Sequence, residues 1–303
     1  MTSVETRESI RQRSYAVVLI SLLRPHHWLK NLLIVVPAIA AHRIDWATAG
    51  TLALAFSSFS LCASGGYVFN DVLDSEADRQ HPRKRTRALA SRRVSTGSAV
   101  SLIVLTWAAG LGIAVAALPR EFGWLMAAYV AATIGYSIRL KREPALDVVV
   151  LAVLNVWRII AGGAATSIPV STWLLAFTLF VCLSLALLKR FIEVLGQPAA
   201  AGSLPGRGYQ ADDAQWLHSA GLAAAYLSVV VLALYVNSPA VSLLYDHPDR
   251  LLLMCPVLLY WSTRAWLRAH RRQSHDDPVL LVALDPVTYV LLVVCAIIVM
   301  AAM

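Results

Sequence analysis

Charged residues are scarce in this sequence. Asp, Glu, Lys and Arg make up 15% of its 303 residues, whereas soluble globular domains carry about 25%. Hydrophobic residues account for 58%, and the mean hydropathy is +0.63. So little charge cannot cover a surface that faces water, which excludes a disordered chain, a coiled coil and a soluble two-domain enzyme. We therefore expect a membrane protein whose solvent includes the lipid bilayer.

Cysteine is also scarce, and no pair shows the CxxC spacing of a metal or redox site. The four cysteines lie inside apolar runs, at Cys62, Cys182, Cys255 and Cys295. They predict small buried side chains and exclude a zinc site and a disulfide framework. The net charge of +8 does not indicate a nucleic-acid partner, because excess Lys and Arg in a membrane protein first mark cytoplasmic loops.

Nine apolar segments are long enough to be candidate membrane spans, given that a helix needs about 20 residues to cross the bilayer. They lie at about 17–41, 47–69, 96–118, 122–138, 146–165, 172–188, 216–236, 250–267 and 279–302. The sequence thus predicts an all-α integral membrane bundle of nine transmembrane helices. A single domain over 1–303 is expected, beginning with a short cytoplasmic segment at 1–15.

The distribution of Lys and Arg predicts how the bundle is oriented. With the N-terminus in the cytoplasm, twenty cations fall on inside segments and three on outside segments. This bias predicts a cytoplasmic N-terminus and an external C-terminus. The remaining cations are Arg24, Lys30 and Arg158, which lie within spans or at their ends. An unpaired charge there costs at least a few kcal/mol, so we expect these three residues to bind substrate, with Arg24 and Lys30 reaching a phosphate. The alternatives are interfacial anchoring for Arg24 and Lys30 and a structural ion pair for Arg158.

A group of acidic residues follows the second predicted span. Asp71, Asp74 and Asp78 are spaced i, i+3 and i+7, so a continuing helix would carry them on one face. Oxygen ligands of this kind select Mg²⁺, which is usually completed by substrate phosphates. We predict that these three residues are the metal ligands and catalytic residues, with Asn70 beside them as a substrate-binding residue.

A basic loop comes directly after the acidic group, and its cations are further candidates for binding phosphate oxygens. They include Arg83, Lys84, Arg85 and Arg87. The alternative is a helix end with solvated acids, followed by a loop that only sets topology. Topology and phosphate binding do not exclude each other in this loop.

The order of these motifs resembles the UbiA superfamily of membrane prenyltransferases. The pattern Asn-Asp-x-x-Asp-x-x-x-Asp at 70–78, followed by a basic loop, looks like the first signature of that family. The segments 24–31, 136–141, 158–163 and 189–193, together with Asp147, more narrowly resemble the decaprenyl-phosphate phosphoribosyltransferase branch. The resemblance implies a nine-helix bundle in a bacterial inner membrane, with its active site on the cytoplasmic side.

The same resemblance implies a reaction and its substrates. The expected enzyme uses Mg²⁺, or Mn²⁺, to move a phosphoribosyl group from 5-phosphoribosyl diphosphate to a polyprenyl phosphate. Its product would feed arabinose donors for surface or secreted glycans, and a rhizobial nodulation protein belongs to this branch. The alternative within the superfamily transfers a polyprenyl chain from its diphosphate to an aromatic acceptor. A non-catalytic transporter is a third possibility, although its ionisable residues should lie near the bilayer midplane.

Where aromatic prenyltransferases of the superfamily carry a second Asp-rich motif, this sequence has Lys189, Arg190 and Glu193. We expect these residues to bind substrate, because a cationic site suits a phosphate-bearing acceptor. Lys141 is a further candidate, open to a role in either topology or phosphate binding. Asp212 and Asp213 are open to two interpretations: they add metal or ribose contacts, or they are acids at the beginning of a helix. The lipid chain length and the oligomeric state stay open.

Overall fold

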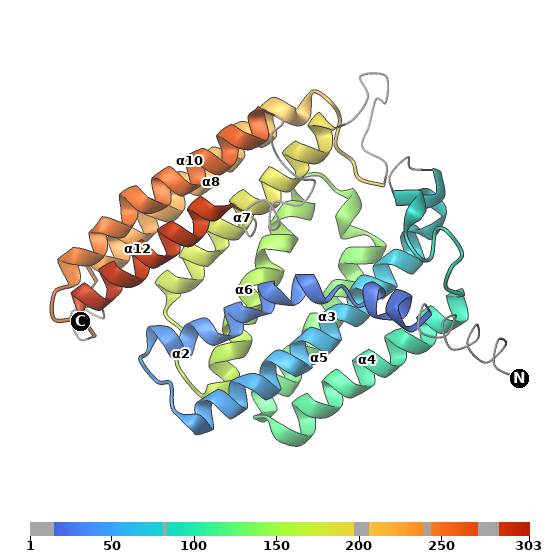
Figure 1. The fold of residues 1–303 in the computed structure, drawn as a ribbon, viewed down its shortest axis with the longest axis horizontal. Coiled ribbons are helices and arrows are strands. Elements are labelled where there is room, and N and C mark those ends of the chain that lie inside the picture. The colour runs from blue at the N-terminus through green and yellow to red at the C-terminus, as the bar shows by residue number, and fades with distance from the viewer. Residues whose placement is uncertain (1–14, 81–83, 197–205, 239–240, 242–243, 272–284) are drawn as a thin grey trace, which may run out of the picture. The chain divides into compact units, whose positions relative to one another are not determined.

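The computed structural model describes residues 15–80, 84–196, 206–238, 241, 244–271 and 285–303. Helices make up the secondary structure of this part, which contains no strand element (Figure 1). The all-helical prediction is therefore confirmed. The chain divides into two compact units, one formed by 1–141 and 157–169 and the other by 142–156 and 170–303. A single domain over 1–303 stays a prediction.

The first unit is built around α3, which lies beside α4 and α5 (Figure 1). Gly110 on α4 permits a close approach to α3, because a Cβ added there would lie 2.6 Å from Cys62 Sγ and 2.9 Å from the Ser58 carbonyl oxygen. The elements of this unit, apart from the end of α6, are η1 (Pro25–Val35), α2 (Val36–Ala40), α3 (Trp46–Gln80), η2 (Lys84–Thr86), α4 (Thr96–Ala117), α5 (Arg120–Ile138) and η3 (Leu140–Arg142).

The length of α3 places the acidic group on the same helix as a membrane span. With 35 residues and a rise of 1.5 Å per residue, α3 extends over about 52 Å, which exceeds the roughly 30 Å hydrocarbon core. The span predicted at 47–69 is thus the first part of a longer helix. Its last turns carry Asp71, Asp74 and Asp78, as the periodicity of the carboxylates predicted.

The first predicted span, 17–41, is not one continuous helix. Residues 15–22 are helical, Arg24 adopts a left-handed conformation with φ 50°, and η1 follows as a 3-10 helix before α2. Pro25 explains the break, because a proline disfavours the right-handed helical conformation in the residue before it. The interruption places Arg24 at a sharp turn between two helical segments.

The second unit groups α7, α8, α10 and α12 side by side (Figure 1). Gly221 on α8 leaves room for the buried Trp266 of α10, since a Cβ at Gly221 would lie 2.0 Å from the indole. The indole donates to Ser184 Oγ of α7 over 3.0 Å, which ties three helices together. The elements, after the first part of α6 (Leu146–Thr166), are α7 (Thr172–Leu195), α8 (Asp213–Val236), η4 (Pro248–Leu253), α10 (Met254–His270) and α12 (Pro286–Ala302).

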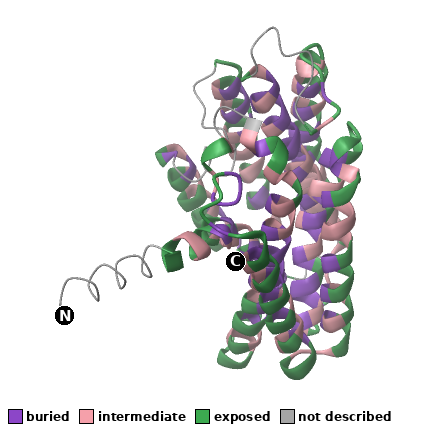
Figure 2. Ribbon diagram, turned by 90° about the vertical axis from the view of Figure 1, so that its right-hand side faces the viewer, coloured by how far each residue is buried: buried purple, intermediate pink, exposed green. Residues whose placement is uncertain are grey.

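Five described helices are long and apolar enough to cross a membrane: α3, α4, α6, α7 and α8. Figure 2 colours exposed residues green. They include large apolar residues on these helices, such as Val115 of α4, which is 77% exposed. Exposed apolar side chains of this kind suit contact with lipid. The chain is therefore a multi-pass membrane protein. α10 and α12 have 17 residues each, and part of the last predicted span, 279–284, lies outside the described residues. The count of nine spans and the orientation stay predictions.

Candidate functional site

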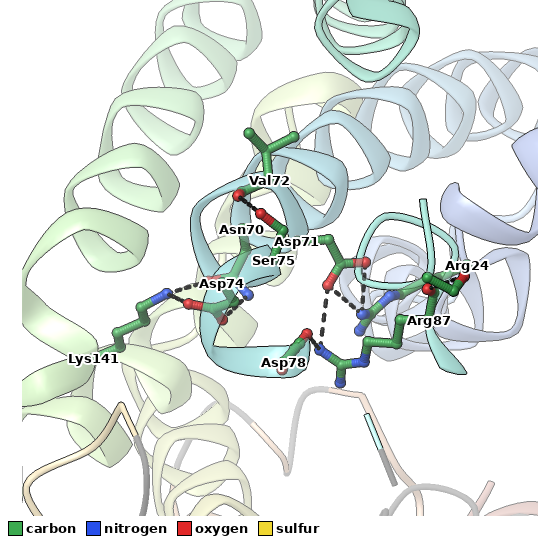
Figure 3. Close-up of polar contacts among 10 residues, drawn as sticks. Arg24, Asn70, Asp71, Val72, Asp74, Ser75, Asp78, Arg87 and Lys141 are labelled. Carbon is green, nitrogen blue, oxygen red and sulfur yellow. Dashed lines mark hydrogen bonds and ion pairs between the residues drawn. The ribbon is translucent and has the colours of Figure 1, made fainter. Parts of the chain in front are cut away.

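The carboxylates at the end of α3 are each bound by cationic side chains from other segments (Figure 3). Asp71 and Asp78 are both about 5% exposed. The Asp71 carboxylate accepts two hydrogen bonds from Arg24 Nη2, of 2.7 and 2.9 Å. Buried carboxylates require such partners, because an unpaired charge is costly to desolvate. The left-handed turn at Arg24 therefore brings a cation from the N-terminal region to α3.

Arg87 links two of the predicted metal ligands. Its Nη1 atom lies 2.7 Å from Asp78 Oδ2 and 3.4 Å from Asp71 Oδ1. One nitrogen thus occupies the position between two carboxylate oxygens, where a positive charge is stabilised from both sides. The structure brings together Asp71, Asp78 and two of the predicted phosphate-binding arginines.

Asp74 belongs to a separate arrangement on the other side of the helix end (Figure 3). Lys141 Nζ donates to Asp74 Oδ1 over 2.6 Å and to Asn70 Oδ1 over 2.9 Å, and the Asn70 amide donates to Asp74 Oδ2. Lys141 is only 3% exposed, so this cation is committed to the acidic group and does not merely set topology from solvent. The three carboxylates therefore divide into a pair, Asp71 with Asp78, and a single Asp74.

The donor chemistry of the pair suits Mg²⁺. Within the described residues, no group of three or more Asp, Glu, His or Cys side chains is arranged to hold a metal. Mg²⁺ does not require such a group, because it is often held by one or two carboxylates together with waters and substrate phosphates. Asp71 and Asp78 fit that pattern, because an oxygen of each carboxylate lies within 3.4 Å of the same positively charged atom group, Arg87 Nη1. The predicted ligand set of Asp71, Asp74 and Asp78 stays a prediction.

A cavity of about 190 Å³ adjoins this pair. Its polar lining includes Arg24, Asp71 and Arg87, and also Ser21 and Arg93, which the sequence reasoning did not single out. Arg93 was counted within the basic loop but not proposed to bind substrate. Three guanidinium groups line this cavity, and guanidinium groups bind phosphate oxygens through paired hydrogen bonds.

The other candidate cations come from the basic loop and from η1. Arg85 of η2 is exposed, whereas Lys84 of η2 and Lys30 of η1 are half-buried. Arg83 lies outside the described residues. Lys30, Lys84 and Arg85 do not line the 190 Å³ cavity. Their roles in substrate binding, and that of Arg83, stay predictions.

Arg158 of α6 occupies a different level of the first unit. It is 4% exposed, its Nε donates to Asn31 Oδ1 over 2.8 Å, and its guanidinium lies 5.0 Å from the centroid of the Phe59 ring. Phe59 precedes Asp71 by twelve residues on α3, or about 18 Å of helix. These contacts fasten η1 against α6 in the first unit. Gly162 supports them, because a Cβ there would lie 2.0 Å from the Ile34 carbonyl oxygen.

The second unit contains its own buried charge cluster. Arg190 on α7 donates to Asp147 on α6 through Nε at 2.5 Å and Nη2 at 3.0 Å, and also to Glu193. Arg207 adds a bond of 3.0 Å to Asp147 Oδ1. Asp147 and Arg190 are fully buried. The sequence predicted Arg190 as a substrate-binding cation, and the structure shows that its guanidinium is already held by two carboxylates.

Tyr209 closes the cluster from the segment before α8. Its hydroxyl accepts a hydrogen bond from the Ala145 backbone N–H over 3.1 Å. Burial, together with the nearby Asp147 charge, raises the pKa of Tyr209 to about 12, so it is neutral at physiological pH.

The neighbouring candidates of the second unit are placed as follows. Lys189 is half-buried, and Asp213 accepts a hydrogen bond from the Gln210 backbone N–H at the beginning of α8. That contact favours a structural role for Asp213.

Comparison of the sequence with known families identifies the family of this chain. The sequence profile of the UbiA prenyltransferase family matches residues 31–284. The chain belongs to the UbiA prenyltransferase family. Membership of this family makes the protein a membrane transferase. The motifs on which the resemblance rests lie within the matched region, apart from residues 24–30.

Two groups of relatives are similar over long regions. The uncharacterised protein y4nM of Sinorhizobium fredii is 34% identical over 94% of this chain, and the nodulation protein NoeC of Azorhizobium caulinodans is 38% identical over 84%. The alignments cover 56% and 83% of those proteins. The decaprenyl-phosphate phosphoribosyltransferase of Mycolicibacterium smegmatis is 38% identical over 58% of this chain and 57% of its own length. This chain therefore spans little more than half of two of these relatives.

A solved structure shows the same fold. The UbiA homologue from Archaeoglobus fulgidus, bound to GPP and Mg²⁺, superposes with a TM-score of 0.67 over 93% of this chain and 96% of its own. The sequence identity is 16%, so the similarity establishes the UbiA fold.

Proposed function

We propose that this UbiA-family protein transfers the phosphoribosyl group of 5-phosphoribosyl diphosphate to a polyprenyl phosphate, using Mg²⁺. The observation that carries the proposal is the cavity beside Asp71, which Arg24, Arg87 and Arg93 also line. A metal diphosphate needs carboxylates for the ion and guanidinium groups for the phosphate oxygens. The similarity to enzymes named decaprenyl-phosphate phosphoribosyltransferase supports this choice of donor and acceptor.

The diphosphate of the donor would take over the contacts that the arginines now make with acids. Arg24 and Arg87 bind Asp71 and Asp78, and pairing with phosphate oxygens instead would release both carboxylates. Asp71 and Asp78 would then hold Mg²⁺, with Asp74 and Asn70 positioned by Lys141 on the adjacent turn. A bound Mg²⁺ would supply neutralisation of the departing diphosphate as a Lewis acid.

The transfer breaks the bond between the ribose carbon and the diphosphate oxygen and forms a bond to an oxygen of the lipid phosphate. Positive charge develops at the ribose carbon, as in other sugar transfers. The lipid phosphate is already anionic, so this protein needs no strong general base. Lys189 stays a predicted contact of the acceptor phosphate, and within the second unit the neighbouring Arg190 binds Asp147 and Glu193.

The two substrates would reach the enzyme from different compartments. With the cytoplasmic orientation predicted from the Lys and Arg bias, the donor would arrive from the cytoplasm and the lipid from the bilayer. The product, a polyprenyl-phosphoryl-phosphoribose, suits the synthesis of arabinose donors for surface or secreted glycans. The relative named nodulation protein NoeC agrees with the expectation that this branch includes a rhizobial nodulation protein.

The deciding experiment supplies each donor separately to the purified protein in detergent with Mg²⁺. Radiolabelled 5-phosphoribosyl diphosphate with polyprenyl phosphate should give a labelled lipid, and the Asp71→Asn variant should form it about 100-fold more slowly. Consumption of an isoprenyl diphosphate with an aromatic acid, while phosphoribosyl diphosphate stays intact, would replace this proposal with aromatic prenyl transfer.

A further inference from the structure

The outward face of α10 carries a groove that the proposed reaction does not use. The groove has a volume of about 460 Å³ and is lined by Tyr260, Thr263, Arg264, Leu267, Arg268 and Arg271. Steps of three and four residues place these side chains on one face of the helix. The opposite face, with Ser262, Ala265, Trp266 and Ala269, is buried in the second unit.

The charge in this groove is only partly balanced. Asp285, at the start of α12, lies 3.1 Å from Arg264 and 3.0 Å from Arg268. Its Oδ1 also accepts a hydrogen bond from the Val287 backbone N–H, so this carboxylate is fixed by three groups. Among the described residues at this groove, three guanidinium groups stand against one carboxylate, which is a formal net charge of +2. A ligand with one or two negative charges would neutralise it.

The apolar and cationic parts of the groove lie at different depths of the predicted span 250–267. Tyr260, 53% exposed, lies within that span, Leu267, 44% exposed, ends it, and Arg268 and Arg271 follow it. Arginines immediately beyond a membrane span face the lipid headgroup region, and tyrosine is favoured just inside it. A molecule that fits this order has an anionic head near Arg268 and Arg271 and an apolar chain along Leu267 and Tyr260.

We propose that the α10 groove, defined by Tyr260, Arg264, Leu267, Arg268 and Arg271, binds an anionic glycerophospholipid of the phosphatidylglycerol type. Guanidinium groups bind a phosphodiester through two parallel hydrogen bonds. A zwitterionic headgroup would bring its own cation toward the arginines, so phosphatidylcholine should bind more weakly. The groove lies on α10, whereas Asp71 and Asp78 lie on α3 and Arg87 follows η2, and this proposal does not depend on the transfer reaction.

The test measures lipid binding by the purified protein in a neutral detergent. Dioctanoyl-phosphatidylglycerol is titrated against the wild type and Arg268→Gln/Arg271→Gln, with dioctanoyl-phosphatidylcholine, inorganic phosphate and farnesyl phosphate as comparison ligands. We expect the double variant to bind phosphatidylglycerol at least tenfold more weakly, because each cation near a membrane surface adds to the attraction of anionic lipid. Arg92→Gln/Arg139→Gln, which removes two exposed arginines elsewhere, should bind as the wild type does.

Several results would overturn the proposal. These are equal binding of the two phospholipids, an unchanged affinity in the double variant, or an equal loss in the control variant. Tighter binding of farnesyl phosphate would assign the groove to a prenyl lipid, and equally tight binding of phosphate alone would show a simple anion site. Photocrosslinking of a phosphatidylglycerol analogue to wild-type protein needs no variant, and its label should map to 260–271.

Discussion

Arg190 and Asp147 form a two-point ion pair in the interior of the second unit, with both side chains withdrawn from solvent. An ion pair in such a place is costly to disrupt, since removal of one partner leaves the other as an uncompensated buried charge. Glu193 and Arg207 extend the pair into a network of four charged groups.

We expect Asp147→Asn to destabilise the protein by about 3 kcal/mol, as found when one member of a buried pair is neutralised. Thermal unfolding of the purified protein in detergent measures the effect as a lowered Tm. Glu193→Gln is the matched control, because its side chain is 24% exposed and water can replace part of the lost interaction. A Tm of Asp147→Asn equal to that of the wild type would show that the pair contributes nothing to stability.

The proposed metal site predicts the effect of single carboxylates on turnover. Asp71→Asn and Asp78→Asn should each lower kcat about 100-fold, since loss of about 3 kcal/mol of transition-state stabilisation corresponds to that factor. EDTA should abolish turnover, and added Mg²⁺ should restore it. Glu76→Gln is the control, because Glu76 is exposed on the same helix end and pairs with Arg79. Full turnover in excess chelator would refute the metal assignment.

Gly162 is predicted to be sensitive to the smallest added side chain. Gly162→Ala would place a Cβ against the Ile34 carbonyl, so η1 must move and stability should fall by roughly 1–3 kcal/mol. Gly112→Ala on α4 meets nothing within 4 Å and should be neutral, or stabilising by up to about 1 kcal/mol, because alanine favours helix. The two unfolding curves, recorded in the same detergent, decide the matter. Equal Tm values for both variants would contradict the close approach of η1 to α6.

The orientation can be tested by labelling single cysteines in intact cells. After replacement of the four native cysteines, Ser91→Cys should resist a membrane-impermeant thiol reagent, because the basic loop is predicted to be cytoplasmic. Ile44→Cys, at a position 63% exposed before α3, should react readily. Labelling at Ser91→Cys without cell lysis would reverse the predicted topology.

The sequence predicted the helical class and most helix positions because lipid imposes a simple rule on composition. A run of apolar residues long enough to span the bilayer has few conformations other than a helix, and 96–118 and 146–165 match α4 and α6 within two residues. The break at Arg24 was not predicted, although Pro25 was the local signal that could have indicated it.

Periodicity placed the acidic residues on one helix but could not specify their partners. Asp71 and Asp74 are three residues apart on α3, yet one binds Arg24 and the other binds Lys141. Those partners come from segments 47 and 67 residues away in sequence, and such contacts depend on tertiary packing. For the same reason the sequence could not show that Arg190 is bound by Asp147.

The left-handed turn at Arg24 has a consequence for the entropy of ligand binding. Pro25 restricts the backbone of this turn. The carboxylate of Asp71 holds the Arg24 guanidinium through two hydrogen bonds. A flexible arginine on a loop loses up to about 2 kcal/mol of rotamer freedom when it binds. Here much of that ordering accompanies folding, so a phosphate that replaces Asp71 as the partner of Arg24 meets a guanidinium that already lines the cavity. Pre-ordering of this kind favours affinity without any additional contact.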